Sequence, residues 1–381
     1  MSDADKRARI AVMIRRFGSQ FGGAEAYVEH LTNELRKTYD IHVFCQAWAS
    51  DAPIPHTTVP RTLGLPNWMD LLDFTWRCQK LTKSFDLVHS HENSWLGEIH
   101  GVHVMPVRFS RLHNRRSWRR QLSTWSSPRL IAYLVLEALR YRQANRQFVA
   151  VSPLTLWQIK AAYRKYPHLS IIPPGVHMPA RRLDRHGACR ILDLPTDRRY
   201  ALLVAHEPLR KGLATLLGAL RHIDSDVDLL VVGGYDGTPT MVRKLAEAVG
   251  LSSRVRTWPL QSDLATFYSA ADICTFFTSG DAFGMVPLEA MSYGRPVIMS
   301  SSRHCGLAHY VTHGVDGLLV DDPRNPHTAA SAINLLLGDE SLYEKLSVNG
   351  RKLAQDMSWQ KCAHLHSALY QRVLSGTRIR A

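Results

Sequence analysis

The sequence predicts an α/β protein of two doubly wound, Rossmann-like domains that face each other across an interdomain cleft. The chain of 381 residues is long enough for two domains of ordinary size. Short runs rich in Val, Ile and Phe alternate with helical patterns in both halves, which is typical of parallel sheets with crossover helices. A proline-rich segment at 170–182 separates the halves and is interpreted as a linker. The predicted domains are 1–175 and 176–357.

In the first half, a glycine loop at 18–23 follows the first strand and leads into a helix over about 24–37. The predicted strands of this half are 9–14, 40–46, 86–91 and 146–152. The second half repeats the pattern with strands at 200–205, 227–234, 254–258, 271–277, 296–301 and 316–320, and a last helix is predicted over 358–374. Ligands of such sheets bind beyond the carboxyl ends of the strands.

The composition excludes several classes of protein. An apolar fraction of 45% with 21% charged residues is that of a packed soluble domain. The longest apolar run, 130–139, is shorter than a membrane span and is interrupted by Glu137. The N-terminus does not resemble a signal peptide. Six cysteines without metal-ligand spacing argue against a disulfide framework or a zinc site, and favour a reducing cytoplasm.

Two loops offer groups that could bind a phosphate. In "FGSQFGGAEAY", Gly22 and Gly23 would let the backbone approach an anion at a helix N-terminus, although such a turn is often only structural. In "VAHEPLRKG", Arg210 and Lys211 follow a strand and precede a helix, where two cations could hold a diphosphate. The alternative for this pair is a solvated turn.

The stretch "TSGDAFGMVPLEAMSYG" (278–294) joins a strand to a helix and carries two acids. Backbone N–H groups of Phe283, Gly284, Met285 and Val286 would face a phosphate, with the helix dipole behind them. Glu289 would lie about one turn inside the helix, where a carboxylate can bind the two hydroxyls of a ribose. Asp281 would meet a sugar hydroxyl. The spacing suits a nucleotide-sugar lying along a helix N-terminus.

Here the sequence resembles the family-4 retaining glycosyltransferases. Asp281 and Glu289 match the family's E-x7-E signature, with Asp in place of the first Glu, and the glycine loop, the "RKG" turn, the "PPGV" linker and the last helix fall in the family's order. Within the family the pattern is most like the bacterial lipopolysaccharide core glucosyltransferases that act on heptose. The resemblance implies the GT-B fold, a UDP-sugar donor bound mainly by the C-terminal domain and no catalytic metal. It also implies a last helix that packs back onto the N-terminal domain.

The resemblance also assigns roles to single residues. Gly22 and Gly23 match the loop near the donor diphosphate, and Arg210 and Lys211 match the pair that neutralises the leaving UDP. Glu289 matches the ribose carboxylate, and Asp281 the acid on the donor sugar. His103 in "GVHV" falls near the family's polar residue beside the reacting sugar. That alignment is loose because His89, His91 and His100 are close by, and a structural role for His103 is an equal alternative.

The net charge of +14 is confined to one segment. Residues 99–183 hold fifteen Lys or Arg and a single acid, Glu137, so this window alone accounts for 15 − 1 = +14. If 108–129 is helical, Trp118, Leu122 and Trp125 fall on one face. Beside that face lie Arg115, Arg116, Arg119 and Arg120, a pattern typical of a segment in a membrane interface. A solvated charge run is the alternative. No nucleic-acid-binding motif accompanies the charge.

The leading hypothesis is a retaining glycosyltransferase at the inner face of the cytoplasmic membrane. It would transfer a hexose, glucose by preference, from a UDP-sugar to lipopolysaccharide core or another lipid-linked glycan, by front-face displacement and without a cofactor. A UDP-sugar 2-epimerase of the same fold and a non-catalytic polyanion-binding protein are the alternatives. The sequence "DSDVD" (224–228) contains a metal-binding DxD, but it precedes the amino end of a strand and is interpreted as a polar turn.

Overall fold

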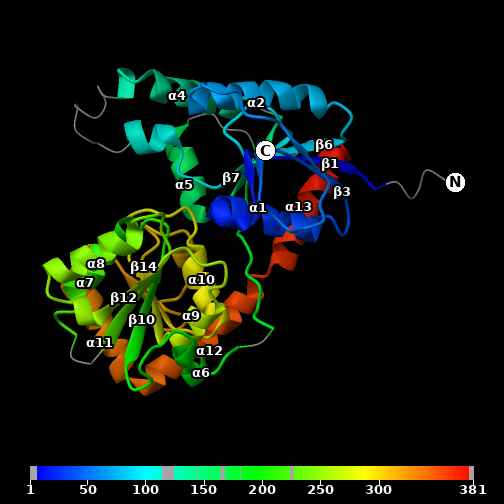
Figure 1. The fold of residues 1–381 in the computed structure, drawn as a ribbon. Helices are drawn as coiled ribbons and strands as arrows, with labels where there is room; N and C mark the ends of the chain where they lie inside the picture. Colours follow the sequence, from blue (N-terminus) through cyan, green and yellow to red (C-terminus); the bar gives the residue numbers. More distant parts are fainter. Residues whose placement is uncertain are drawn as a thin grey trace. The chain divides into compact units, whose positions relative to one another are not determined.

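The protein's structure is a computed structural model that describes residues 7–113, 124–143, 145–163, 168–180, 182–223 and 227–376. The chain divides into two compact units, one formed by Met1–Pro174 with Trp359–Ala381 and the other by Gly175–Ser358 (Figure 1). Each unit is a parallel sheet with helices on both faces, so the prediction of two doubly wound domains is confirmed.

The first unit contains a seven-stranded parallel sheet in the order β5-β3-β1-β6-β7-β8-β9. Val12 in β1 aligns with Val43 in β3 on one side and with His89 in β6 on the other, so the strand order reverses beside β1. The strands are β1 (Arg9–Met13), β3 (Asp40–Cys45), β5 (His56–Thr58), β6 (Leu87–Ser90), β7 (Ile99–Val102), β8 (Gln147–Ala150) and β9 (His168–Ile171); β2 (Arg16–Phe17) and β4 (Ala47–Trp48) form a separate pair.

Three strands of this sheet were not predicted from the sequence. β7 has the sequence IHGV, in which a histidine and a glycine interrupt the apolar run, and β5 is only three residues long. β9 adjoins the proline-rich segment, and Ser170 and Ile171 belong to it. The linker interpretation of 170–182 is therefore wrong in its first two residues.

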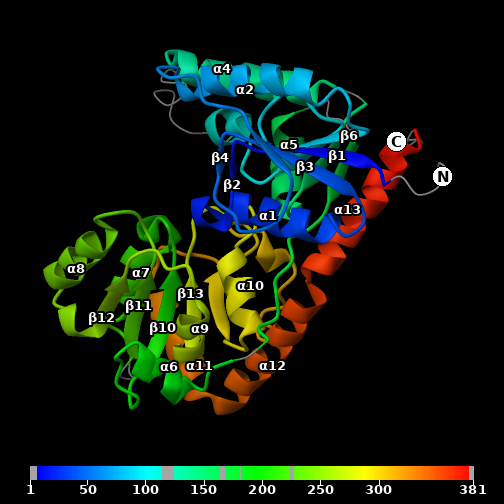
Figure 2. The same cartoon turned by 45° about the vertical axis from the view of Figure 1, so that its right-hand side comes forward.

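The helices of the first unit cover both faces of its sheet. They are α1 (Gly23–Leu35), α2 (Asn67–Leu81), α4 (Pro128–Tyr141), α5 (Pro153–Ala162) and α13 (Trp359–Leu374). α2 and α4 lie side by side on one face, and α1 and α13 lie against the other (Figures 1 and 2). No helix of the described residues is both long and apolar enough to cross a bilayer.

Helix α13 contributes to the core of the first unit although it follows the second unit in sequence. Trp359, Leu369 and Tyr370 are almost fully buried. The Tyr370 hydroxyl lies 2.7 Å from Nδ1 of His89 in β6, and the Tyr39 hydroxyl lies 2.8 Å from the Ser367 hydroxyl. The sheet of this unit is therefore covered by a helix from the far end of the sequence.

The second unit contains a six-stranded parallel sheet in the order β12-β11-β10-β13-β14-β15. All six residues of β11, VDLLVV, are buried, as expected for a strand with helices on both faces. The strands are β10 (Arg199–Val204), β11 (Val227–Val232), β12 (Val255–Trp258), β13 (Ile273–Phe276), β14 (Val297–Ser300) and β15 (Leu318–Val320).

Seven helices of the described residues flank this sheet: α6 (Arg185–Ile191), α7 (Leu213–Ala219), α8 (Thr238–Ala248), α9 (Ala265–Ala270), α10 (Met285–Ser292), α11 (Pro326–Gly338) and α12 (Glu340–Asp356). α7, α8 and α11 share one apolar core with the strands, whereas α9 and α10 pack on the opposite face (Figures 1 and 2). The crossovers after β10 and after β13 therefore lie on different faces.

The packing of α13 generates a stability prediction. Replacing the fully buried Leu369 by Ala should lower the free energy of unfolding by about 2–5 kcal/mol, because it removes buried methyl groups and leaves a cavity. Leu365 on the same helix is 38% exposed, and Leu365→Ala should cost less than about 1 kcal/mol. Urea unfolding followed by tryptophan fluorescence measures both. Equal losses in the two variants would contradict the assignment of α13 to this core.

Candidate functional site

The second unit has a topological switch point between β10 and β13. The two strands are parallel neighbours, with Ala201 aligned to Ile273, yet the chain leaves β10 toward β11 and leaves β13 toward β14. The loops 205–212 and 277–284 therefore leave the same edge of the sheet in opposite directions. Such a point is where open α/β sheets bind their ligands.

An ion pair joins these two loops. Lys211 ends a short 3-10 helix, Pro208–Lys211, and its Nζ contacts Oδ2 of Asp281. The same Nζ lies 4.7 Å from the centre of the Phe276 ring. The side chains of Lys211 and Asp281 are 11% and 19% exposed, so the pair is partly shielded from water. A lysine held in this way presents a fixed positive charge to an anion at the carboxyl edge of the sheet.

Asp281 is fixed by its backbone as well as by Lys211. Its N–H donates to the His304 carbonyl at 2.8 Å, and its own carbonyl accepts from the Gly306 N–H at 3.2 Å. Its Oδ1 accepts from the Phe283 N–H at 3.1 Å. The structure thus gives the Phe283 N–H, which the sequence placed toward a phosphate, a protein partner.

Gly284 precedes α10 with φ of +98°, and a Cβ there would lie 2.7 Å from Sγ of Cys305. Only glycine fits such a position without strain. The next two residues, Met285 and Val286, form the first turn of α10, where N–H groups have no partner within the helix. These two N–H groups and the helix dipole remain suited to an anion.

Glu289 lies one turn inside α10, as the sequence predicts. Its Oε2 accepts a hydrogen bond of 2.7 Å from the Tyr268 hydroxyl of α9. Burial raises the pKa of Glu289, and the Tyr268 hydrogen bond opposes that rise. In the described part of the chain, Tyr268 of α9 is the hydrogen-bond partner of this carboxylate, which α10 carries.

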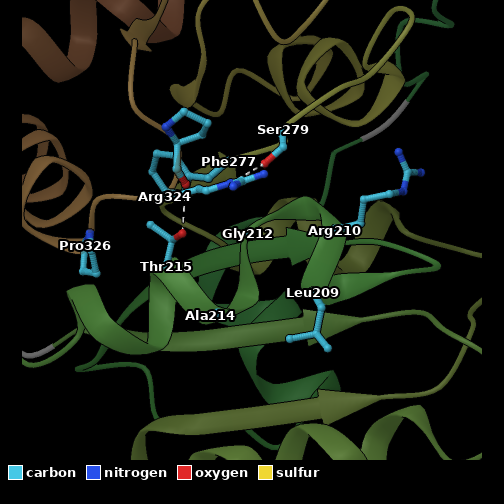
Figure 3. Close-up of a pocket in the computed structure, with 10 residues that line it drawn as sticks. Leu209, Arg210, Gly212, Ala214, Thr215, Phe277, Ser279, Arg324 and Pro326 are labelled. Atoms are coloured by element: carbon cyan, nitrogen blue, oxygen red, sulfur yellow. Dashed lines mark hydrogen bonds between the residues drawn. The ribbon is translucent and has the colours of Figure 1, made fainter. Parts of the chain in front are cut away.

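Arg210 is oriented differently from its neighbour Lys211. Its side chain is 51% exposed, its Nε donates to Glu207 at 2.7 Å, and its Nη1 donates to the Gly280 carbonyl at 3.1 Å. It lines a cavity of about 460 Å³ together with Leu209, Gly212, Ala214, Thr215, Phe277, Ser279, Pro323, Arg324 and Pro326 (Figure 3). The structure thus brings Lys211, rather than Arg210, to Asp281.

Two polar residues at this edge were not singled out from the sequence. Nδ1 of His206, just after β10, is buried without a hydrogen-bond partner among the described residues. Arg324, which follows β15, donates through Nε to the Ser279 hydroxyl at 3.2 Å and reaches over the cavity (Figure 3). Their common signal is position, because each closely follows the carboxyl end of a strand.

The first unit has its own switch point between β1 and β6. Gly22 lies in the loop after β1, with φ of +150° at the N-cap of α1, a conformation that favours glycine. Gly23 begins α1, and a Cβ added there would meet no atom within 4 Å. Gly22 is therefore required by its backbone conformation, whereas a small side chain at position 23 would have room.

His91 and His103 form a pair at the carboxyl edge of β6 and β7. Nδ1 of His91 lies 2.8 Å from Nε2 of His103. Burial, with a smaller effect from the charge of Arg140, lowers the pKa of His103 to about 3, so the imidazole is neutral at pH 7. His89 and His100 lie fully buried within their strands. Of the four histidines considered from the sequence, only His91 and His103 are partly exposed.

The basic segment is only partly described. Arg115, Arg116, Trp118, Arg119 and Arg120 lie outside the described residues. The adjoining helix α4 leaves Val135 and Leu139 51% and 46% exposed, and Trp125 just before it is 59% exposed.

Glu137, the single acid of 99–183, is not on the surface. It is 5% exposed and accepts from the N–H groups of Val107 and Arg108 at 2.8 and 2.9 Å and from the Tyr163 hydroxyl at 2.6 Å. The charge that this segment presents to solvent is therefore entirely positive.

The described residues give no support for metal binding by the DxD sequence at 224–228. Residues 224–226 of the DxD sequence lie outside them, and Asp228 is paired with Arg198 at 2.5 Å. Within the described part of the chain, no group of three or more His, Cys, Asp or Glu side chains could hold a metal ion.

Family models match both halves of the chain. Residues 21–178 match the model "Glycosyltransferase Family 4", and residues 188–353 match "Glycosyl transferases group 1". The chain is a glycosyltransferase of the GT-B type. The expectation of the GT-B fold is thereby confirmed, and so is the resemblance at the level of these families.

Several named proteins are similar to this GT-B glycosyltransferase. A D-inositol 3-phosphate glycosyltransferase of Xylanimonas cellulosilytica is 31% identical over 51% of this chain and 49% of that protein. One of Corynebacterium glutamicum is 28% identical over 81% and 77%, and the alpha-maltose-1-phosphate synthase of Mycolicibacterium smegmatis is 24% identical over 96% and 99%. These relatives are not named as enzymes of lipopolysaccharide synthesis.

Solved structures share the fold. WaaG, a glycosyltransferase involved in lipopolysaccharide biosynthesis, superposes with a TM-score of 0.79 at 19% identity, over 96% of this chain and all of that one. Anabaena Alr3699/HepE, in complex with UDP-glucose, superposes with a TM-score of 0.74 at 17% identity, over 95% and 99%.

The buried histidines predict an acid-sensitive fold. Burial lowers the pKa of His366 to about 4 and that of His103 to about 3, below their ordinary value of 6.5. At a pH between these lowered pKa values and 6.5, the unfolded chain binds more protons than the folded chain. The stability present above pH 6.5 is therefore lost as the pH falls toward 4. Urea unfolding at several pH values measures this slope. His366→Gln should make it shallower, whereas a change at the exposed His364 of the same helix should not; equal slopes in both would contradict the prediction.

Proposed function

We propose that this protein is a retaining hexosyltransferase that takes its sugar from UDP-hexose, with UDP-glucose as the first candidate. The observation that carries the proposal is the Lys211–Asp281 ion pair at the β10/β13 switch point, in the loops that precede α7 and α10, the second of which carries Glu289. In chain order, Lys211, Asp281 and Glu289 match the diphosphate, the sugar and the ribose of a nucleotide-sugar.

Each donor group has a proposed chemical role. Lys211 and the N–H groups of Met285 and Val286 neutralise the diphosphate, Glu289 accepts hydrogen bonds from the ribose hydroxyls, and Asp281 binds a hydroxyl of the hexose. An arriving diphosphate would compete with Asp281 for the Lys211 ammonium and so free that carboxylate for the sugar. The structural likeness to a protein solved with UDP-glucose supports this choice of donor.

The proposed reaction is a front-face displacement without a metal ion. The bond from the anomeric carbon to the β-phosphate breaks, the acceptor hydroxyl attacks from the same face, and the departing phosphate oxygen takes its proton. Charge develops on the leaving diphosphate, so fixed positive charge at Lys211 lowers the barrier. The family resemblance also proposes a role in the reaction for His103 of the first unit, whose imidazole is neutral at pH 7.

The proposed acceptor is a lipid-linked glycan, with lipopolysaccharide core as the first candidate. The motif resemblance and the fold of WaaG support this class. The names of the curated relatives favour a different one, a small phosphorylated polyol or sugar. Both acceptor classes therefore belong in the test.

An anionic membrane is the proposed partner of the first unit, at the inner face of the cytoplasmic membrane. Exposed Trp125, Val135 and Leu139 adjoin a segment whose exposed charges are all positive, because Glu137 is buried. Apolar side chains enter the acyl boundary, and each nearby basic residue adds about 1 kcal/mol at an anionic surface.

A transfer assay tests the proposal. Purified protein is given radiolabelled UDP-hexoses one at a time with truncated lipopolysaccharide, with D-inositol 3-phosphate, or with no acceptor. Label in the lipid fraction supports the proposed acceptor, and label in the inositol phosphate supports the relatives' class. Conversion of the UDP-sugar without an acceptor would favour the epimerase alternative. Binding of polyanions without any UDP binding would favour the non-catalytic one.

The two adjacent cations should differ in importance. Lys211→Ala should lower turnover by about 10²–10³-fold, the effect of removing one preorganised group that stabilises developing charge. Arg210→Ala should lower it less, because Arg210 is half exposed and bound to Glu207. Steady-state kinetics with the donor found above, and circular dichroism as the folding control, measure both. Near-normal turnover of Lys211→Ala would remove Lys211 from the site.

Membrane binding should depend on α4 as well as on the arginines. Val135→Ser with Leu139→Ser should weaken binding to vesicles containing anionic lipid, and so should neutralising Arg115, Arg116, Arg119 and Arg120, while UDP affinity stays unchanged. Leu335 of the second unit is 54% exposed, and Leu335→Ser is the matched control. Vesicle sedimentation measures the effect. Unchanged binding in both sets of variants would refute the docking role.

A further inference from the structure

A buried tyrosine holds one oxygen of Glu289. Tyr268 is 2% exposed and belongs to α9, and its hydroxyl donates to Oε2 of Glu289 at 2.7 Å. Its ring stacks on that of Tyr293, with centres 5.2 Å apart and planes at 27°. Neither ring can turn freely, so the hydroxyl is held at a fixed place.

The second oxygen of Glu289 is not held. Among the described residues, Oε1 of Glu289 accepts no hydrogen bond, although the side chain is only partly exposed. A carboxylate with one oxygen fixed and the other open has a defined direction in which it can accept further hydrogen bonds. The open oxygen can then accept from neighbouring hydroxyls of a ligand.

We propose that Tyr268 is a positioning residue for the nucleotide: it fixes Glu289 so that Oε1 accepts from the two ribose hydroxyls. This inference rests on the proposed role of Glu289 in donor binding. A glutamate side chain loses rotamer freedom when it binds a ligand, which costs entropy. The hydrogen bond to Tyr268 already fixes the side chain in the folded protein, so this entropy is not lost on binding. The contribution of Tyr268 therefore passes through Glu289 alone.

The tyrosine hydroxyl also favours the charged form of the carboxylate. Burial raises the pKa of Glu289, and the Tyr268 hydroxyl stabilises the anion and lowers it again. Among the described residues, the other titratable groups that interact with this carboxylate are Cys274 of β13 and Tyr293. Burial raises the pKa of both, so both are neutral at pH 7. Without the Tyr268 hydroxyl the carboxylate would take up a proton at higher pH, and the acid limb of UDP affinity would move to higher pH.

The test measures binding of UDP and of 2′,3′-dideoxy-UDP, which lacks both ribose hydroxyls, by calorimetry. Tyr268→Phe keeps the ring and removes only the hydroxyl. It should weaken UDP about tenfold, the loss of one hydrogen bond to a charged group, and should leave dideoxy-UDP almost unchanged. Tyr293→Phe removes the hydroxyl of the stacking partner and should alter neither nucleotide. In a Glu289→Gln background, Tyr268→Phe should have no further effect on UDP.

Two results would overturn the inference. One is an equal loss of both nucleotides in Tyr268→Phe, which would make Tyr268 a merely structural residue. The other is an acid limb of UDP affinity that does not move relative to Tyr293→Phe. If the wild-type protein bound UDP and dideoxy-UDP equally well, the proposed role of Glu289 would itself fail, and the tyrosine inference with it. That outcome is distinct because it is seen before any variant is made.

Discussion

The reversal of strand order beside the first strand of each sheet is the constraint on which the candidate site depends. At such a reversal two parallel strands are neighbours. The chain continues from one of them to a strand on its left and from the other to a strand on its right. The two loops leave the same edge of the sheet toward opposite sides. Lys211 and Asp281 are 70 residues apart in sequence, and they meet because β10 and β13 are neighbours at such a reversal.

The parts of the site that follow from local pattern could be predicted from the sequence. Each strand–loop–helix unit carries its own signals: a buried apolar run, a glycine, and a helical pattern that begins just after it. The positions of Lys211, Asp281 and Glu289 relative to strand ends and helix starts therefore follow from neighbouring residues alone. So does the fold class, because the alternation repeats through both halves.

The sequence does not show which of two adjacent loop residues points into the site, nor which side chains of different elements are in contact. Arg210 and Lys211 are adjacent, and only the conformation of the turn directs one toward Asp281 and the other toward Glu207. Tyr268 lies 21 residues before Glu289, on another helix, and no local pattern marks it as a partner. The burial of Glu137 likewise depends on how α4 packs.

The histidines illustrate the same limit. The sequence contains four histidines close together, at positions 89, 91, 100 and 103. Their spacing does not show which of them can contact a ligand. Strand register and the end points of β6 and β7 bury the first and third members and leave the other two partly exposed. Which imidazole can act on a ligand is thus a property of where two short strands stop.

The place of α13 in the first unit has a consequence for biosynthesis. A ribosome makes residues 7–174 first, then the whole of the second unit, and only afterwards the helix that carries Leu369 and Tyr370. Domains are usually completed in the order of their translation. Here the second unit can finish folding while the first still lacks α13. The hydrogen bond between His89 and Tyr370 can therefore form only late in synthesis. The part of the first unit that α13 later buries thus stays uncovered until the end of translation.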